Sequence, residues 1–226
     1  MPLQIIGTSH IAKESIKEIE RYIKEQKPDI VAVELDVQRA ASLFKKEQKL
    51  GWNQVFSVGV KGFLFAKVGH YLQQKLGKIV GVEPGSEMKA ALELAQKHKL
   101  QVAYIDQPLA VTLRRFSQEL TWKERGRFVG DVITGLLFPK RQLKNSGLDQ
   151  FDLRKVPTKD MITKMMQQIK VRYPSIYKVL VEDRNKYMVK QLIRIIREQP
   201  RKSILVIVGA GHKEGMEELL LKVEVI

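Results

Sequence analysis

Residues 204–212 read ILVIVGAGH, an apolar run that leads directly into a glycine-rich segment ending in a histidine. Such a short run of consecutive, mostly β-branched apolar residues is typical of a buried strand. The N-terminus repeats the arrangement, because the apolar run Leu3–Ile6 is followed by residues 7–10, GTSH. The spacing Gly-x-x-His therefore occurs near both ends of the chain, each time just past a predicted strand. We interpret the two copies as parts of one shared site.

The two motif histidines, His10 and His212, allow two kinds of function. Imidazole is a common metal ligand and the side chain that titrates nearest neutral pH. The pair is therefore predicted either to hold a divalent metal ion or to act as acid and base. The structural alternative is two tight turns, in which glycine supplies backbone freedom and histidine caps a helix.

Short apolar runs alternate with helical patterns along the chain, which is typical of a parallel sheet covered by helices. The pattern predicts strands at Leu3–Gly7, Ile30–Leu35, Lys78–Glu83, Gln101–Asp106 and Ser203–Gly209. It predicts helices at Ala12–Glu25, Gln38–Gln48, Ser86–Lys97 and His212–Leu221. The expected fold class is therefore α/β, with a mostly parallel central sheet flanked by helices.

The last predicted strand follows the fourth only after residues 107–200, a separation too long for an ordinary connection. This stretch has a helical pattern and is rich in basic residues, with its longest helical candidates at 121–137 and 173–198. A chain of 226 residues is large enough to bury a core of its own. We expect a single domain, residues 1–226, with a helical insertion at residues 107–200 before the last strand.

The composition limits the chemistry and the partners. The chain has no cysteine, so a metal ion would be held by histidine, carboxylate, backbone oxygen or water. The formal net charge of +15 raises the question of nucleic-acid binding. However, the Lys and Arg residues are spread along predicted helices and no nucleic-acid-binding signature is present, so specific nucleic-acid binding is not expected. An anionic membrane surface, an acidic partner, simple solvation and an oligomeric state are all left open.

The location expected from the sequence is the cytoplasm. The absence of cysteine favours a reducing compartment. The first residues pass into a strand without the pattern of a signal peptide, and no apolar run approaches the length of a membrane span. The chain as given is expected to be soluble.

Ionisable residues follow nearly every predicted strand. They are His10, Glu34 with Asp36, Glu83 with Glu87, Asp106, and His212. Because ligands of open parallel sheets bind outside the carboxyl ends of the strands, these side chains are predicted to converge. Two imidazoles and one or two carboxylates would bind a divalent ion and leave a position for water, with a further carboxylate as general base.

Each of these acids has a structural alternative as a helix cap or a first-turn charge. The alternative is weakest for Glu34, because it lies inside the apolar run 31–35, VAVEL, where a buried carboxylate needs a partner. Arg39, five residues further on, is predicted to hold that carboxylate or to stabilise an oxyanion, and its structural alternative is a solvated helix charge. Arg184 and Asn185 form a second polar cluster in the insertion, for which the pattern favours a solvated helix face.

Other catalytic motifs are not supported. Residues 208–215, VGAGHKEG, resemble a dinucleotide-binding fingerprint, but only eleven residues follow Gly215, too few for the next strand and its acidic residue. The chain contains no Gly-x-Ser-x-Gly elbow and no phosphate-loop lysine motif.

Taken along nearly the whole chain, these motifs resemble the TraB family, which groups with Tiki proteases and with erythromycin-esterase-like and ChaN-like proteins. The residues that carry the resemblance are 7–10 with Ser15, 33–36 with Arg39, Gly81 with Glu87, Ala91 and Ala95, 105–106, 112–113 with Arg115, 184–185 with Met188, and 208–212 with Gly215. Relatives often have Arg-Asp after the position of Asp106, where this chain has Gln107 and Pro108. Longer relatives append hydrophobic membrane segments, so the resemblance also allows the soluble domain of a membrane-anchored protein.

The resemblance implies a metal-dependent, peptidase-like site. Tiki-type members cleave peptides with manganese or cobalt, and bacterial TraB-type proteins are linked to the shutdown of a peptide pheromone. Carried onto this chain, the motifs nominate His10, His212 and Glu34 for a Mn²⁺ or Co²⁺ ion and, with Arg39, for catalysis. Supporting or substrate-binding roles fall to Asp36, Glu83, Glu87, Asp106, Arg115, Arg184 and Asn185. The pattern does not decide whether Glu34 is a ligand or a base.

Two functions are therefore expected from the sequence. The first is a metal-dependent hydrolase, a peptidase acting on a peptide or another small substrate. The second is a non-catalytic binding protein that sequesters a peptide, haem or another ligand in the same cleft.

Overall fold

The computed structural model describes residues 3–8, 13–44, 85–137 and 159–224. The predicted strand Lys78–Glu83 and the motif histidine His10 lie outside these residues, as does Glu83 itself. The statements below concern the described part of the chain.

The sheet contains four described strands in the order β1-β4-β2-β3. Strand β4 (Ile204–Gly209) pairs in parallel with β1 (Leu3–Thr8) and with β2 (Ile30–Val33), and β2 pairs in parallel with β3 (Gln101–Tyr104). All side chains of β2 and β4 are buried, because both faces of these central strands are covered. The predicted α/β fold with a parallel sheet is confirmed.

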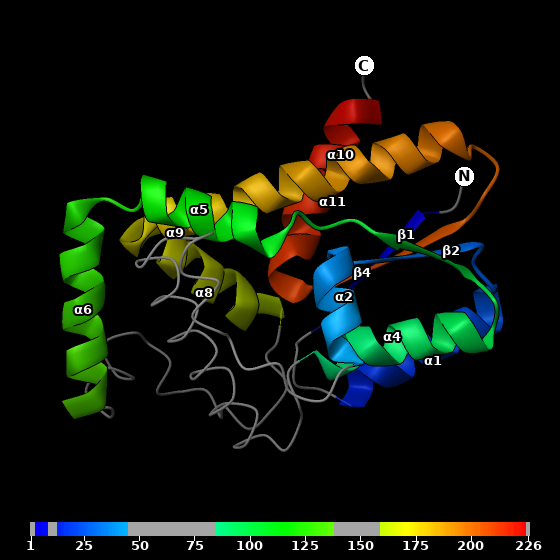
Figure 1. Ribbon diagram of the computed structural model, residues 1–226, viewed down its shortest axis with the longest axis horizontal. Helices are drawn as coiled ribbons and strands as arrows, with labels where there is room; N and C mark the ends of the chain where they lie inside the picture. Colours follow the sequence, from blue (N-terminus) through cyan, green and yellow to red (C-terminus); the bar gives the residue numbers. More distant parts are fainter. Residues whose placement is uncertain (1–2, 9–12, 45–84, 138–158, 225–226) are drawn as a thin grey trace.

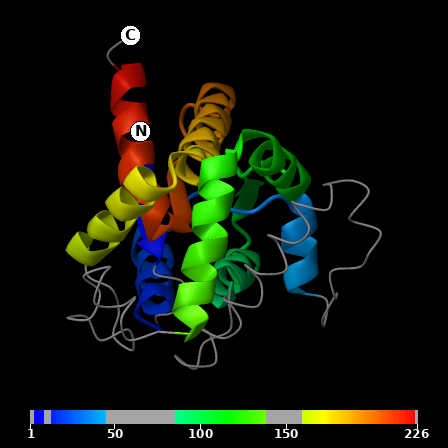
Figure 2. The same cartoon turned by 90° about the vertical axis from the view of Figure 1, so that its left-hand side faces the viewer.

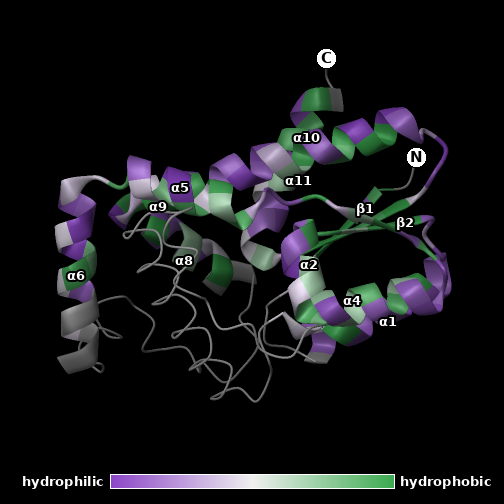
Figure 3. Ribbon diagram, viewed as in Figure 1, coloured by the Kyte–Doolittle hydropathy of each residue, from purple (hydrophilic) through white to green (hydrophobic). Residues whose placement is uncertain are grey.

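Helices cover the sheet on both sides (Figure 1). On one face α1 (Lys13–Gln26) and α4 (Ser86–Lys97) pack against alternate strand residues such as Val31 and Val33. On the other face α10 (Asp183–Glu198) and α11 (Ala210–Glu224) pack against the residues between them, such as Ala32. Figure 3 shows the consequence, apolar strands in the middle with polar residues gathered on the outer helices.

The helical insertion is confirmed. After β3 the chain forms α5 (Leu109–Glu119), α6 (Trp122–Leu137), α8 (Lys159–Arg172), α9 (Pro174–Tyr177) and the π-helical turn η2 (Lys178–Glu182), and then enters α10. These elements extend beyond one end of the sheet, and α6 lies farthest from the sheet in Figure 1. In Figure 2, which turns this end towards the viewer, α6 is the bright green helix in front. A small core of Phe116, Ile176 and Val179 holds α5 to α9 and η2.

The predicted ends of two strands and the predicted start of one helix need correction. Strands β2 and β3 end at Val33 and Tyr104, so Glu34 and Asp106 follow their strands instead of lying inside or at the end of them. Backbone hydrogen bonds nevertheless continue past the strand ends, from Glu34 N–H to the Ile207 carbonyl (3.0 Å) and from Asp106 N–H to the Leu35 carbonyl (3.2 Å). The two carboxylates are therefore held side by side at the carboxyl edge of the sheet.

The second correction concerns the glycine-rich segment after β4. The sequence predicted a helix from His212, whereas α11 begins at Ala210, directly after the strand. Gly85, at the start of α4, has a left-handed backbone (φ 82°), and no other described glycine has a positive φ. The glycines around His212 therefore do not serve the backbone freedom that the turn interpretation required.

Candidate functional site

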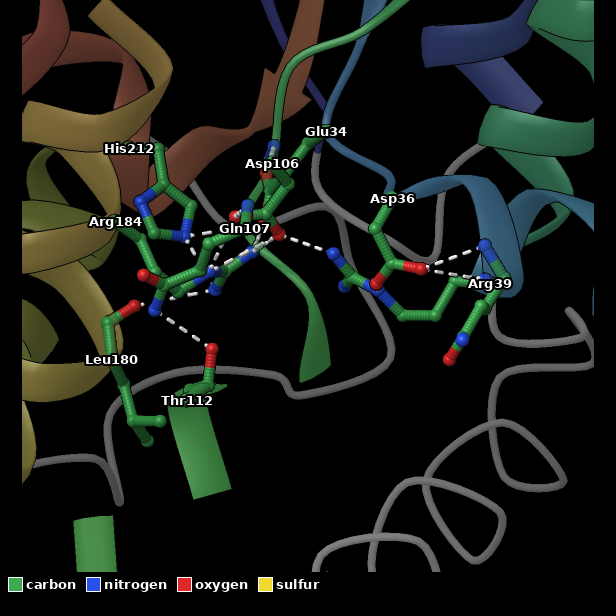
Figure 4. Close-up of polar contacts among 11 residues, drawn as sticks. Glu34, Asp36, Arg39, Asp106, Gln107, Thr112, Leu180, Arg184 and His212 are labelled. Carbon is green, nitrogen blue, oxygen red and sulfur yellow. Dashed lines mark hydrogen bonds and ion pairs between the residues drawn. The ribbon is translucent and has the colours of Figure 1, made fainter. Parts of the chain in front are cut away.

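Glu34 is the carboxylate at the centre of a buried polar cluster at the carboxyl edge of the sheet (Figure 4). Its side chain is only 7% exposed. One carboxylate oxygen, Oε2, accepts a hydrogen bond from the Gly209 N–H at 2.6 Å, and the other, Oε1, contacts the Arg184 guanidinium. The predicted need of this buried carboxylate for a partner is met by a cation from the insertion and by the last backbone N–H of β4.

Arg184 joins the parts of the cluster that come from different elements. Its Nη2 contacts both Glu34 and Asp106, the latter at 2.6 Å from Oδ2, and its Nε lies 3.2 Å from each oxygen of Asp106. Its Nη1 donates to the Leu180 carbonyl at 3.2 Å, within the π-helical turn η2. Such turns occur often at functional sites. The expectation of a solvated face is wrong for this part of α10, because Arg184 and Asn185 point into the cluster.

His212 is held by both of its ring nitrogens. Nδ1 lies 2.7 Å from Asn185 Oδ1, and because an amide oxygen only accepts, Nδ1 carries the proton. Nε2 lies 3.1 Å from Arg184 Nη1 and 3.2 Å from Glu34 Oε1. A neutral imidazole accepts a hydrogen bond from the arginine there, whereas an imidazolium donates to the glutamate. The position of Nε2 thus suits a group that gains and loses a proton.

A second arginine, Arg39, lies on the more exposed side of the cluster. Its Nε donates to Asp36 Oδ2 at 2.8 Å, and its Nη2 contacts Asp106. Asp36 also caps α2 (Val37–Leu43), since its Oδ1 accepts from the N–H groups of Gln38 and Arg39. The side chain of Arg39 is 28% exposed, against 14% for Arg184. Arg39 is thus the more accessible of the two cations.

The charged groups of the cluster are Glu34, Asp36, Asp106, Arg39 and Arg184. These three carboxylates and two guanidinium groups leave one excess negative charge while the imidazole is neutral. Burial opposes the ionisation of Glu34, but the imidazolium form of His212, the charge of Arg184 and the Gly209 N–H hold its pKa well below the usual range. Burial likewise disfavours the charged form of Arg184, yet Glu34 and Asp106 raise its pKa above the ordinary value.

Acidification is expected to reduce the stability gained from these carboxylates. The folded protein lowers the pKa of Glu34, as described above, and also that of Asp36, where burial opposes ionisation but hydrogen bonds from Arg39 outweigh it. Stabilisation by such a group is present above its unfolded pKa, about 4, and is lost as the pH falls through the lower folded value. In urea denaturation, the stability difference between the wild type and Glu34→Gln should therefore narrow between pH 7 and pH 3.5. Glu18→Gln, an exposed control on α1, should differ from the wild type by less than about 0.5 kcal/mol at both pH values. If the stability difference between the wild type and Glu34→Gln is the same at both pH values, the pKa of Glu34 is not lowered in the folded protein.

The other predicted residues occupy different positions. Glu87 is buried, 2% exposed, in the first turn of α4. Arg115 is half exposed and pairs at 3.0 Å with Asp183, which precedes Arg184 in the sequence and is not one of the carboxylates of the cluster. The functional roles assigned to Glu87, Arg115, His10 and Glu83 stay predictions, as do those assigned to the residues of the cluster.

Sequence reasoning missed two contributors. Gln107 is buried, its N–H donates to Asp106 Oδ1 at 2.8 Å, and its side chain donates to Thr112 at 2.8 Å. Its position directly after Asp106 was the available signal. Gly215 is the other, because a Cβ there would lie 2.5 Å from Asn185 Nδ2. The available signal was its place among the residues that carry the family resemblance.

The described donors do not by themselves fit a metal ion. Among the residues that the structure describes, no group of three His, Asp or Glu side chains is arranged to hold one. The atoms that would serve, Glu34 Oε1 and His212 Nε2, both face the Arg184 guanidinium. His10, the third predicted ligand, lies outside the described residues.

The parallel α/β sheet was predicted from the alternation of apolar runs with helical patterns. The cluster at its carboxyl edge contains residues from several motifs that carry the resemblance: Glu34, Asp36, Arg39, Asp106, Arg184, Asn185 and His212. The model of the TraB/PrgY/gumN family matches residues 3–224, and the chain belongs to this family.

Individual proteins are also similar to this chain in sequence. An uncharacterized protein of Methanocaldococcus jannaschii is 33% identical over 228 residues, covering 98% of this chain and 54% of the relative. The human TraB domain-containing protein is 26% identical over 244 residues, covering 95% of this chain and 61% of the relative. The chain thus spans little more than half the length of these relatives.

A solved structure of an erythromycin esterase mutant in its open conformation is also similar, with 13% identity and a TM-score of 0.34 over 92% of this chain and 60% of that one. The strand order and pairing of this chain define its fold.

None of the described helices is long and apolar enough to cross a membrane.

Proposed function

We propose that this chain is a hydrolase that cleaves a peptide, or another small carbonyl substrate, at the cluster around Glu34, Arg184 and His212. The observation that carries the proposal is the position of His212 Nε2, within 3.2 Å of a carboxylate oxygen and 3.1 Å of a guanidinium nitrogen. A proton acceptor, a carboxylate that stabilises its charged form and a donor for an oxyanion are thereby collected at one point.

In the proposed reaction, His212 Nε2 takes a proton from a water molecule as its oxygen attacks the substrate carbonyl carbon. Nδ1 stays bonded to Asn185, which fixes the orientation of the ring. Protonation of Nε2 sets two donors face to face, which releases Arg184 Nη1 from the imidazole and makes it available to the developing oxyanion. Glu34 then stabilises the imidazolium, which returns the proton to the leaving amine as the carbon–nitrogen bond breaks.

Hydrolysis is tested directly with a peptide library and detection of products by mass spectrometry. His212→Ala is expected to lower turnover by about 10²–10⁴-fold while circular dichroism shows a folded protein. The matched control is His98→Ala, because His98 is exposed at the end of α4 and should leave turnover unchanged. Equal activity of the two variants would remove His212 from the mechanism.

Metal dependence is an alternative form of the proposal, which the family resemblance motivates, because His212 Nε2 cannot bind a metal ion and accept the proton of water at the same time. The proposed ligands are His10, His212 and Glu34, with Mn²⁺ or Co²⁺ as the ion, which would polarise a carbonyl or activate water. Calorimetric titration of metal-free protein with manganese, cobalt and zinc, beside the His10→Ala/His212→Ala double variant, decides it. Tight binding that the double variant loses supports the metal, and absence of binding to the wild type argues against it.

One observation favours a second function, a non-catalytic protein that sequesters a peptide, haem or another ligand. Each carboxylate in the cluster already has a guanidinium partner, as in a structural ion-pair network. This alternative predicts stoichiometric capture of a ligand without any product by mass spectrometry.

A further inference from the structure

A groove of about 570 Å³ runs between α10 and the last turns of α11, away from the residues of the Glu34 cluster. Its apolar lining comes from both helices: Val189, Ile193, Leu219 and Val223. Val223 is 39% exposed, so part of this apolar surface is open to solvent. Ligand sites for small molecules have about 300–1,000 Å³, and this groove falls within that range.

Basic side chains from a single face of α10 line the same groove: Lys186, Lys190, Arg194 and Arg197. Spacings of three and four residues place them along one face of the helix. The lining contains one acid, Glu198, which pairs with Arg194 at 2.7 Å. Within the described parts of the chain, Lys186, Lys190 and Arg197 have no carboxylate within ion-pair distance.

We propose that this groove binds one long-chain amphiphile with an anionic head, such as a fatty-acid carboxylate. The acyl chain would lie along Val189, Ile193, Leu219 and Val223. The head would pair with the cations on the α10 side, for which Lys190 and Arg197 are available.

The lining favours an acyl chain over single-stranded nucleic acid. Binding of single-stranded nucleic acid uses aromatic side chains on which bases stack, and the residues that line this groove include none. A thin apolar chain with a single negative head meets both the volume and the charge.

The first test measures binding of oleate, below its micellar concentration, to the full chain by calorimetry. Val223→Asp places a negative charge on the apolar lining and should weaken binding by at least about tenfold. Leu221→Asp is the matched control, because Leu221 lies on the same helix, is 62% exposed and does not line the groove. Binding that resists Val223→Asp, or falls equally in both variants, would overturn the proposal.

The second test separates the head group from the chain. Lys190→Gln/Arg197→Gln should weaken oleate binding, whereas Lys17→Gln/Lys123→Gln, which removes the same charge from exposed positions elsewhere, should not. Oleyl alcohol, which lacks the negative head, should bind more weakly than oleate. Vesicles of anionic phospholipid form a further arm. Binding to vesicles without binding of monomeric oleate would assign the cations to a membrane surface and would also overturn the proposal.

Discussion

Replacing Arg184 by methionine is expected to lower the free energy of unfolding by about 3–5 kcal/mol, the usual cost of removing one partner from a buried ion pair. The reason is that the substitution leaves two carboxylates buried. The carboxylates of Glu34 and Asp106 are 7% and 1% exposed, and Arg184 contacts both of them. Without the guanidinium, Glu34 has lost its cation inside the protein, and both carboxylates repel each other at close range. Denaturation in urea at pH 7 measures the loss.

Arg115 provides a matched control for this substitution. It also pairs with one aspartate, Asp183, at 3.0 Å, but its side chain is 50% exposed. Solvent screens such a pair, so Arg115→Met should cost less than about 1 kcal/mol. Similar losses for the two arginine variants would contradict the interpretation that burial makes Arg184 essential.

A second comparison tests the cause of the loss more directly. In the background of Glu34→Gln/Asp106→Asn, the neighbours of Arg184 carry no charge. Arg184→Met should then cost much less than in the wild type, because no buried carboxylate is stranded. A loss of the same size in both backgrounds would assign the effect to the packing of the arginine side chain instead of its charge.

The sequence was sufficient to predict the parts of the fold that depend on local patterns. The runs at Ile30–Val33 and Ile204–Gly209 are short and apolar, and they form the central strands. The alternation of such runs with helical patterns predicted the parallel sheet, and parallel strands bring their carboxyl ends to one edge. The approach of Glu34 and Asp106 follows from that geometry alone.

The partners of these carboxylates were not predictable in the same way. Arg184 is 150 residues from Glu34 in the sequence, and its helix has polar residues on much of its surface. Local periodicity cannot show which of those polar residues faces another element. The solvated-face interpretation of Arg184 and Asn185 failed for this reason, although Lys186 and Lys190 on the same helix are exposed.

The glycines of the C-terminal motif show a similar limit. The sequence suggested that they give the backbone freedom for a turn, but the segment is the start of α11. Close packing is what Gly211 meets instead, because a Cβ there would lie 3.1 Å from the sulfur of Met166. At Gly7, which precedes the first motif histidine, a Cβ would lie 3.2 Å from the Ala210 backbone. Composition shows that glycine is present, but only the packing shows what its missing side chain makes room for.

Gly215→Ala is expected to disturb His212 without touching it. The added Cβ would lie 2.5 Å from Asn185 Nδ2, far inside van der Waals contact, so the amide must move. Asn185 is buried, and its Oδ1 holds His212 Nδ1 at 2.7 Å. The expected results are a loss of about 1–3 kcal/mol in stability from overpacking and a shift of the His212 ring ¹⁵N resonances in NMR spectra. Under the proposed function, peptide hydrolysis falls as well, because the imidazole is no longer oriented.

Two kinds of control show whether the effect passes through Asn185. Gly126 and Gly130 lie in α6, and in the described part of the chain no atom outside the local helix backbone lies within 4 Å of the Cβ that alanine would add. Alanine at either position should therefore be neutral or stabilise the helix by up to about 1 kcal/mol. In an Asn185→Ala background the obstructing amide is absent, and Gly215→Ala should then cost little stability and leave the His212 resonances where Asn185→Ala alone puts them. If Gly215→Ala costs as much without Asn185 as with it, the glycine serves the packing of α11 in general. If the stability loss of Gly215→Ala disappears in the Asn185→Ala background, contact with the Asn185 amide causes the loss. The same amide then orients the His212 ring.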